Sequence, residues 1–489
     1  MSVSGPLFIV GTLGALSILL LILRRFTLIV AWVAAAAAAA LAVCVSLVPL
    51  DQPFDLGPIT VTLGEPLSVL GRVAVIEPVD QLPLVLISSI ACALFLIAWR
   101  VLPRSNFYSS GLAILALQAS ALMVTQVVYA ALFVEIAALL TLLPLHEPIV
   151  DREGNSFGGG ARGGLQYMVY VTLALPGLMI TQLLLEQFAA FPSDQSLLQS
   201  ATVLLGLSFA LLLGAVPFQS WLSAVSTDGS PPAVTYLFTV NLGTVWFLLL
   251  AYLETYGWLS RQVAFGQLFT VVGLIMMVAG GVLAASQDRL GRIVGYATLA
   301  DNGAMFVALG SRQITGLSLS LVMLLARPLS LGLMTLGLDG LRRLGRGDDR
   351  AGRLAGAAWQ APWRTLAYVV GGISLAGFPL SLGFASRWGL YRLVSETSVF
   401  RAVLALVSSA GVMMGLVSNM RLLLSAPSDM DTGEVLDTPR VPMRRWREDP
   451  VVLAIIVALI VGTYVLGLFP QLLSGIAFRM AEGFTFFTQ

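Results

Sequence analysis

Long apolar runs separated by short polar segments follow one another from one end of the sequence to the other. A membrane-spanning helix needs roughly 20 mostly apolar residues. About fourteen runs meet or approach this length, so the pattern predicts an all-α membrane protein that crosses the bilayer many times. We expect the spanning helices at Pro6 to Leu23, Phe26 to Val48, Leu82 to Leu102, Ser109 to Val128, Ala130 to Leu145, Leu165 to Phe188, Leu197 to Val216, Pro232 to Tyr252, Phe265 to Ser286, Gly291 to Leu309, Gly316 to Leu338, Thr365 to Val394, Ala402 to Leu424 and Val451 to Leu472.

The segments between these runs predict little additional structure. In the connection between the second and third runs, Ile59, Val61 and Leu63 alternate with polar residues, which predicts a short strand or hairpin. The first run is followed at once by Arg24 and Arg25 and by a second run, so we expect a retained helix rather than a signal peptide. The longest polar connections, residues 341–362 and 425–450, are interpreted as charged linkers.

Composition excludes several classes of function. With 57% hydrophobic residues, 11% charged residues and a mean hydropathy of +0.90, the chain is no soluble domain. Its net charge of +1 predicts no nucleic-acid partner. Cys44 and Cys92 lie in apolar runs without a metal-binding motif, so no metal is expected. No nucleotide loop, flavin motif or iron–sulfur motif is present, so the chain alone offers no catalytic chemistry.

The distribution of arginine predicts the orientation of the chain in the membrane. Cytoplasmic loops collect positive charge, and the odd-numbered loops carry most of the loop arginines. We therefore expect a multi-pass protein of the plasma (inner) membrane with both termini on the non-cytoplasmic side.

Two of the predicted helices contain sequences that break a helix near its middle. The first break is at residues 214–218 and includes Pro217, and the second is at residues 377–380 and includes Gly377 and Pro379. The two segments are five apart, so they run in opposite directions. Paired interruptions of this kind are typical of an inverted repeat with a pathway near the midplane, although either proline alone could be a harmless kink.

Four ionisable residues inside apolar segments are candidates for a proton pathway, because a charge within the membrane is costly and usually functional. They are Glu135, Asp301, Arg327 and Arg387. Each also has a purely structural interpretation. Glu135 could serve packing alone, Asp301 and Arg327 could form a structural ion pair between adjacent segments, and Arg387 could extend to the membrane surface.

The sequence contains no lysine. A buried lysine can release its proton near neutral pH, whereas arginine stays charged in proteins. Arg327 and Arg387 can therefore attract anions but cannot pass a proton onward. Glu135, Asp301 and ordered water are the intramembrane groups that could do so.

Three motifs identify a family resemblance. Val216 to Leu222 with Gly229 to Val234 is similar to a VPFHxWxPD…GAPxPV pattern, Gln287 to Ala300 to a QxxxKRLLAYSSIA pattern, and Ser374 to Phe384 to an SLAGxPxxxGF pattern. Together they resemble the antiporter-like subunits of respiratory complex I and of related cation/proton antiporters and membrane hydrogenases. The third pattern, the length and the lack of a long lateral C-terminal helix resemble the N-type subunit of complex I.

The resemblance implies a domain organisation of two inverted five-helix repeats, each with one broken helix. The first repeat would span residues 106–255 and the second residues 262–424. Residues 1–105 would form N-terminal helices with an external hairpin, and residues 425–489 a linker and the last helix.

The family's functional positions are only partly kept. Glu135 matches the essential glutamate of segment five, and Arg387 matches the terminal lysine of segment twelve. The lysines of segments seven and eight fall on Leu212 and on Leu242, or on Asn241 if the register shifts by one. Gln219 and Asp301 stand where the family has histidines. The resemblance therefore implies a degenerate relay at Leu212, Leu242 and Gln219.

The function implied is that of a membrane-arm subunit of a complex I-type NADH:quinone oxidoreductase, which either contributes to proton translocation or supports it structurally. Flavin, iron–sulfur clusters and quinone would then belong to partner subunits, and other membrane subunits and the lipid bilayer would surround the chain. The alternative is a subunit of a carbon-uptake, cation/proton antiporter or membrane hydrogenase complex. Partner identity would distinguish the two.

Overall fold

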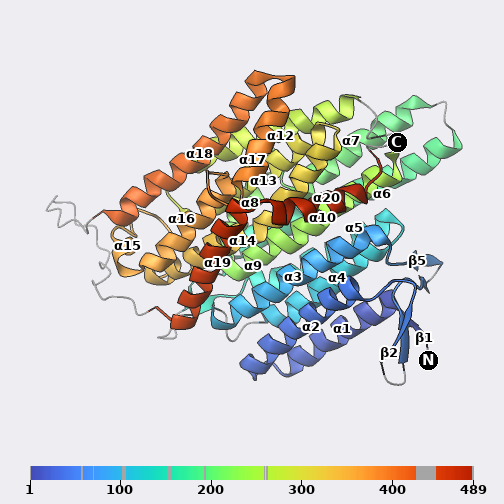
Figure 1. The fold of residues 1–489 in the computed structure, drawn as a ribbon, viewed down its shortest axis with the longest axis horizontal. Helices are drawn as coiled ribbons and strands as arrows, with labels where there is room; N and C mark the ends of the chain where they lie inside the picture. The colour runs from blue at the N-terminus through green and yellow to red at the C-terminus, as the bar shows by residue number, and fades with distance from the viewer. Residues whose placement is uncertain are drawn as a thin grey trace.

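The computed structural model describes residues 2–56, 59–69, 71–101, 106–150, 156–157, 159–191, 194–257, 259, 263–425 and 448–486. Most of these residues belong to helices that run side by side in one bundle, with the N-terminal helices on one flank (Figure 1). The prediction of an all-α, multi-pass membrane protein is confirmed.

The N-terminal flank consists of three long helices and a small β region between the second and the third. β2 pairs antiparallel with β3, and β1 pairs parallel with β3. β4 and β5 form a second antiparallel pair. The predicted hairpin is therefore present. The bounds are β1 Ser2–Ser4, α1 Gly5–Ile22, α2 Thr27–Leu47, β2 Pro53–Leu56, β3 Ile59–Thr62, β4 Leu67–Val69, β5 Arg72–Ala74 and α3 Pro78–Val101.

The middle of the chain contains the first broken helix. The helix that begins with α7 stops, and the chain continues through the short α8 into a composite helix made of α9, the π-helical η1 and α10. The bounds are α4 Phe107–Met123, α5 Val127–Leu145, β6 Ile149–Val150, β7 Ser156–Phe157, α6 Ala161–Ala190, α7 Gln195–Leu212, α8 Ser220–Asp228, α9 Pro231–Tyr236, η1 Leu237–Asn241 and α10 Leu242–Thr255.

The last part contains the second broken helix, α16 with α17, and two C-terminal helices. The bounds are α12 Val263–Ala285, α13 Leu290–Gly310, α14 Ile314–Leu344, α15 Ala357–Gln360, α16 Pro362–Ala376, α17 Phe384–Thr397, α18 Val399–Leu424, α19 Pro450–Leu468 and α20 Gln471–Glu482. Side chains of α10, α13 and α14 are mostly buried, so these helices form the core of the bundle.

Twelve helices of the described part of the chain are long and apolar enough to cross a membrane. Two of the fourteen predicted segments are not among them. One is found as α4, which is shorter, and the other as the pair α16 and α17.

Three predicted boundaries are wrong. α14 continues through Leu344 instead of ending at Leu338, because buried ion pairs stabilise the charged residues of its last turns. Part of the supposed linker 341–362 is consequently helical. The last predicted helix ends at Leu468 instead of Leu472, because Pro470 cannot donate the hydrogen bond that a continuous helix requires, and a further helix, α20, follows it. Most of the other linker, residues 426–447, lies outside the described residues.

Candidate functional site

The first helix break lies between α7 and α8. Gly214 adopts a left-handed conformation with φ of +67°, which other residues rarely adopt. The amide of Ala215 turns back to donate to the carbonyl of Ala210 at 2.7 Å. Pro217 follows at the exposed side of the break. The helix thus ends inside the bundle, and the carbonyl of Leu213 needs a partner from elsewhere.

The second break lies between α16 and α17. Gly377 has φ of +76° and closes α16 with a donated hydrogen bond to the Ser374 carbonyl at 3.1 Å. Phe378 donates to the Ile373 carbonyl at 3.2 Å. Pro379 lies on the exposed surface, and α17 starts at Phe384. The second turn therefore resembles a glycine-terminated helix end, and Arg387 lies in the first turn of the helix that follows.

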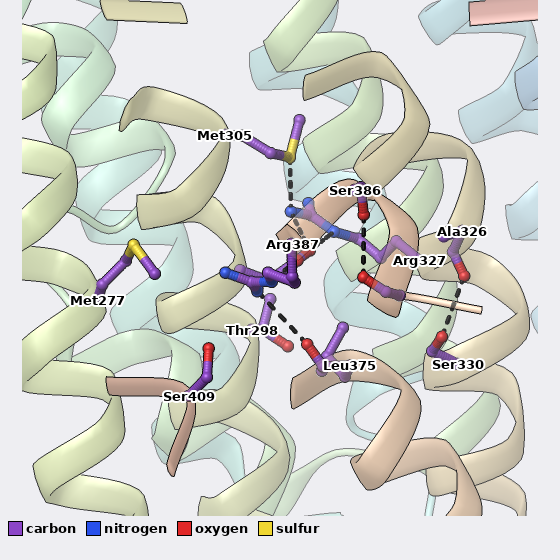
Figure 2. A network of polar contacts seen from close by, with 12 residues as sticks. Met277, Thr298, Met305, Ala326, Arg327, Ser330, Leu375, Ser386, Arg387 and Ser409 are labelled. Atoms are coloured by element: carbon purple, nitrogen blue, oxygen red, sulfur yellow. Dashed lines mark hydrogen bonds and ion pairs between the residues drawn. The ribbon is translucent and has the colours of Figure 1, made fainter. Parts of the chain in front are cut away.

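Three of the four candidate charges meet beside the second break. Figure 2 shows two of them, Arg327 and Arg387, pointing toward one another. Arg327 on α14 donates through Nε and Nη2 to Oδ2 of Asp301 on α13, at 2.8 and 2.7 Å. Arg387 on α17 donates through Nη2 to Oδ1 of Asp301 at 2.9 Å. All three residues are at most 4% exposed. They form a buried Arg327–Asp301–Arg387 triad.

The remaining donors of the triad have few partners. Arg327 Nη2 also contacts the Met305 sulfur at 2.9 Å, and Arg387 Nη2 also contacts the carbonyl of Leu375, at the end of α16, at 3.4 Å. Figure 2 shows both contacts. Within the described residues Arg387 Nη1 has no hydrogen-bond partner. The triad carries two positive charges and one negative charge, so a net positive charge is buried there.

A cavity of about 10 Å³ lies next to the triad. Its lining includes Ser330, Ser374 and Ser386 as well as the three charged residues, and the hydroxyls of Ser330 and Ser374 are 2.8 Å apart. This size is at the lower limit for one water molecule, and the lining offers the polar partners that a buried water needs. Since arginine keeps its proton, Asp301 and such a water are the groups here that could exchange one.

Glu135 lies apart from this cluster. It is half-buried on α5, next to exposed Ile136, and no hydrogen bond or ion pair joins it to another residue of the described chain. Its carboxyl group therefore lies at the border between the buried and exposed faces of α5, where lipid or another chain could contact it.

The positions expected to form a degenerate relay are largely apolar and buried. Leu212, the last residue of α7, is 3% exposed, and Leu242, the first of α10, is 1% exposed. Gln219 is half-buried, and its Oε1 finds no partner within the described chain. The alternative register places Asn241 at the second position, where its amide donates to Thr141 on α5 at 2.8 Å. No cationic side chain contacts Glu135 at any of these places in the part that the structure describes.

A family model described as "NADH:quinone oxidoreductase/Mrp antiporter, TM" matches residues 166–414, about half of the chain. The match covers both breaks and the whole triad. The chain belongs to the NADH:quinone oxidoreductase/Mrp antiporter family.

Curated members of this family are moderately similar. NADH-quinone oxidoreductase subunit N 1 of Herpetosiphon aurantiacus is 26% identical over 259 residues, which cover 52% of this chain and 52% of the relative. Subunit N of Methylococcus capsulatus is 26% identical over 289 residues, covering 55% and 58%. The chain thus spans about half the length of the curated relatives it matches.

Solved structures share the fold along nearly the whole chain. A chain of the Mrp complex from Dietzia sp. DQ12-45-1b superposes with a TM-score of 0.72 at 18% identity, covering 98% of this chain and 95% of its own. A chain of respiratory complex I from Thermus thermophilus has a TM-score of 0.67 at 20% identity, covering 96% and 98%. At these identities the likeness concerns the family fold alone.

The structure contains a second cluster of buried charged residues, which is not among the sites predicted from the sequence. Asp339 on α14 is 0% exposed and lies 2.9 Å from Arg343 Nε and 3.6 Å from Arg364 Nη1. The i, i+4 spacing of Asp339 and Arg343 was the available signal. The predicted helix ends at Leu338, one residue before Asp339, so the pair falls outside it. Asn302, next to Asp301, was also missed.

Proposed function

We propose that this chain is an N-type membrane-arm subunit of a complex I-type NADH:quinone oxidoreductase. In this role it supports proton translocation by holding a fixed buried charge at the second break, rather than by a lysine relay of its own. The observation that carries the proposal is the triad. A carboxylate held between two arginines at membrane depth would be costly to keep for packing alone.

The residues at the relay positions favour a supporting role for this chain over proton conduction by the chain itself. Leu212 and Leu242 can neither accept nor release a proton, and the arginines of the triad stay protonated. Proton passage from Glu135 to Asp301 would therefore depend on water alone. A fixed positive charge can instead act at a distance, because a charge in a low-dielectric interior shifts the energy of charged states nearby.

The proposal includes the surroundings of the chain. Flavin, iron–sulfur clusters and quinone would reside in partner subunits, and the lateral surface would contact other membrane subunits and lipid. The membrane would be the plasma (inner) membrane, with both termini on its non-cytoplasmic side.

Mass spectrometry of the complex that copurifies with this chain in mild detergent tests the assembly. Recovery of flavin and iron–sulfur subunits with sister antiporter-like chains is the expected result. A carbonic-anhydrase-like partner, or small antiporter subunits only, would instead assign the chain to carbon uptake or to cation exchange.

Proton pumping tests the role of Glu135. We expect Glu135→Gln to leave the ratio of protons pumped to electrons transferred within error of wild type, because its carboxyl group is not joined to the triad. Glu186→Gln, which changes an exposed carboxylate of α6, is the matched control. A drop in the ratio for Glu135→Gln alone would show that this chain conducts protons itself.

A further inference from the structure

Asn302 connects α13 to the first helix break. Its side-chain amide donates to the carbonyl of Leu213 at 3.0 Å, and the residue is 2% exposed. Leu213 is the C-cap residue directly after α7, so its carbonyl has no partner in a next helical turn. In a membrane such a freed carbonyl must be satisfied from within the protein, and Asn302 supplies the donor.

The neighbouring residue connects the same helix to the second break. Asp301 holds Arg387 at 2.9 Å, and the same Nη2 of Arg387 reaches the Leu375 carbonyl, near the end of α16, at 3.4 Å. The side chains of adjacent residues in an α-helix point about 100° apart, so Asp301 and Asn302 of α13 can contact two different helices.

We infer that Asp301 and Asn302 are a positioning pair that couples the two helix breaks. Asn302 holds the end of α7 directly, and Asp301 holds the end of α16 through Arg387. When Asp301 or Arg387 changes its contacts, α13 shifts and the strain reaches Leu213 through Asn302. A role of the Asp301–Asn302 pair in proton translocation rests on the proposed function. The mechanical link between the two breaks can be measured without any electron transfer or proton pumping.

Hydrogen exchange in the purified complex measures this link. The amides of Gly214, Ala215 and Phe218 form the backbone hydrogen bonds of the first break, so their exchange rates report its opening. We expect Asn302→Leu, which keeps the side-chain size but lacks the donor, to speed their exchange about fivefold, the factor that one net hydrogen bond provides.

Arg387→Gln provides the decisive comparison, because Arg387 lies at the other break. It should speed exchange at the first break when Asn302 is present and have no added effect in the Asn302→Leu background. Asn419→Leu is the matched control. Asn419 is equally buried and donates to the Gln287 carbonyl at 2.8 Å, beyond the end of α12 and away from both breaks.

The inference is wrong if Arg387→Gln leaves exchange at the first break unchanged, or if its effect is the same with and without Asn302. The Arg387→Gln measurement decides the question even if Asn302→Leu fails to assemble. Failure of the proposed function would appear elsewhere, in the copurifying partners, so the two can fail independently.

Discussion

Replacing Asp301 with asparagine removes the only negative charge of the triad. Both arginines would then be buried with like charges facing one another and no carboxylate between them. Removing one partner of a buried ion pair costs about 3–5 kcal/mol, because the remaining charge is left uncompensated. Two charges are stranded here, so the upper end of this range is the expected loss in stability for Asp301→Asn.

Replacing Arg387 with glutamine should cost less. Asp301 keeps the two contacts from Arg327 at 2.7 and 2.8 Å, and the remaining pair is neutral instead of carrying a net positive charge. The lost interaction is one charge-assisted hydrogen bond of about 1.5–3 kcal/mol. We therefore expect the order of stability wild type, Arg387→Gln, Asp301→Asn, with a clear gap between the variants.

An apolar replacement of the whole triad separates stability from function. Asp301→Leu, Arg327→Met and Arg387→Met together leave no charge at the position of the triad, and such replacements are often neutral or stabilising by about 1–4 kcal/mol. The assay is the fraction of intact detergent-extracted complex that remains on gel filtration after heating. The reasoning is refuted if Asp301→Asn is as heat-stable as Arg387→Gln, or if the triple variant is the least stable of all.

Three further changes give independent tests. Gly377→Ala forces a side chain into a left-handed position, at a cost of about 1–2 kcal/mol. The new Cβ would also overlap the Arg387 side chain, so its heat stability should fall at least to that of Arg387→Gln, and wild-type stability would contradict this. Leu212→Lys should leave the proton to electron ratio within error of that of Leu212→Met, because Leu242 would still interrupt a relay, and a higher ratio would show that this chain conducts protons itself. Burial raises the pKa of the Glu448 carboxyl, against the lowering effect of the Arg364 charge, so the folded chain favours its protonated form and loses stability as pH rises above the ordinary value of 4.5. Glu448→Gln should therefore melt higher than wild type at about pH 8 and equally below about pH 4, and a difference that grows in acid would reverse the sign.

Helices were predictable where apolar residues continue without interruption, and less so where charges are buried in pairs. α14 was predicted too short because a hydropathy pattern counts Asp339 and Arg343 as two polar residues. In the structure they neutralise one another at 2.9 Å, and the helix continues through them. The breaks, in contrast, were readable from the local sequence, because glycine and proline lie close together there and both disfavour a continuous helix. A single proline is not sufficient, since α14 continues through Pro328.

The site was predictable only in part, for a similar reason. Asp301 and Arg327 lie on neighbouring helices, so their contact could be expected from the order of segments. Arg387 lies 86 residues from Asp301 along the chain, and the alternative that it extends to the membrane surface was equally consistent with the sequence. That alternative is wrong, because Arg387 is 2% exposed. Asn302 gave no signal beyond being polar, because its partner is a backbone carbonyl that only the fold brings near.

The contacts at the second break explain why residue 387 of the triad is an arginine. A single guanidinium must reach both the Asp301 carboxylate and the Leu375 carbonyl across the second break, and it must keep its charge without water around it. The planar fork of arginine presents several donors in a fixed arrangement and does not release its proton, whereas a lysine would offer a single charged centre that burial can neutralise. A lysine there would favour proton exchange, and an arginine favours permanent attachment of α17 and α16 to α13. An arginine at position 387 is therefore the residue that the inferred link between the two breaks requires, and the proposed supporting role of the triad follows from the same property.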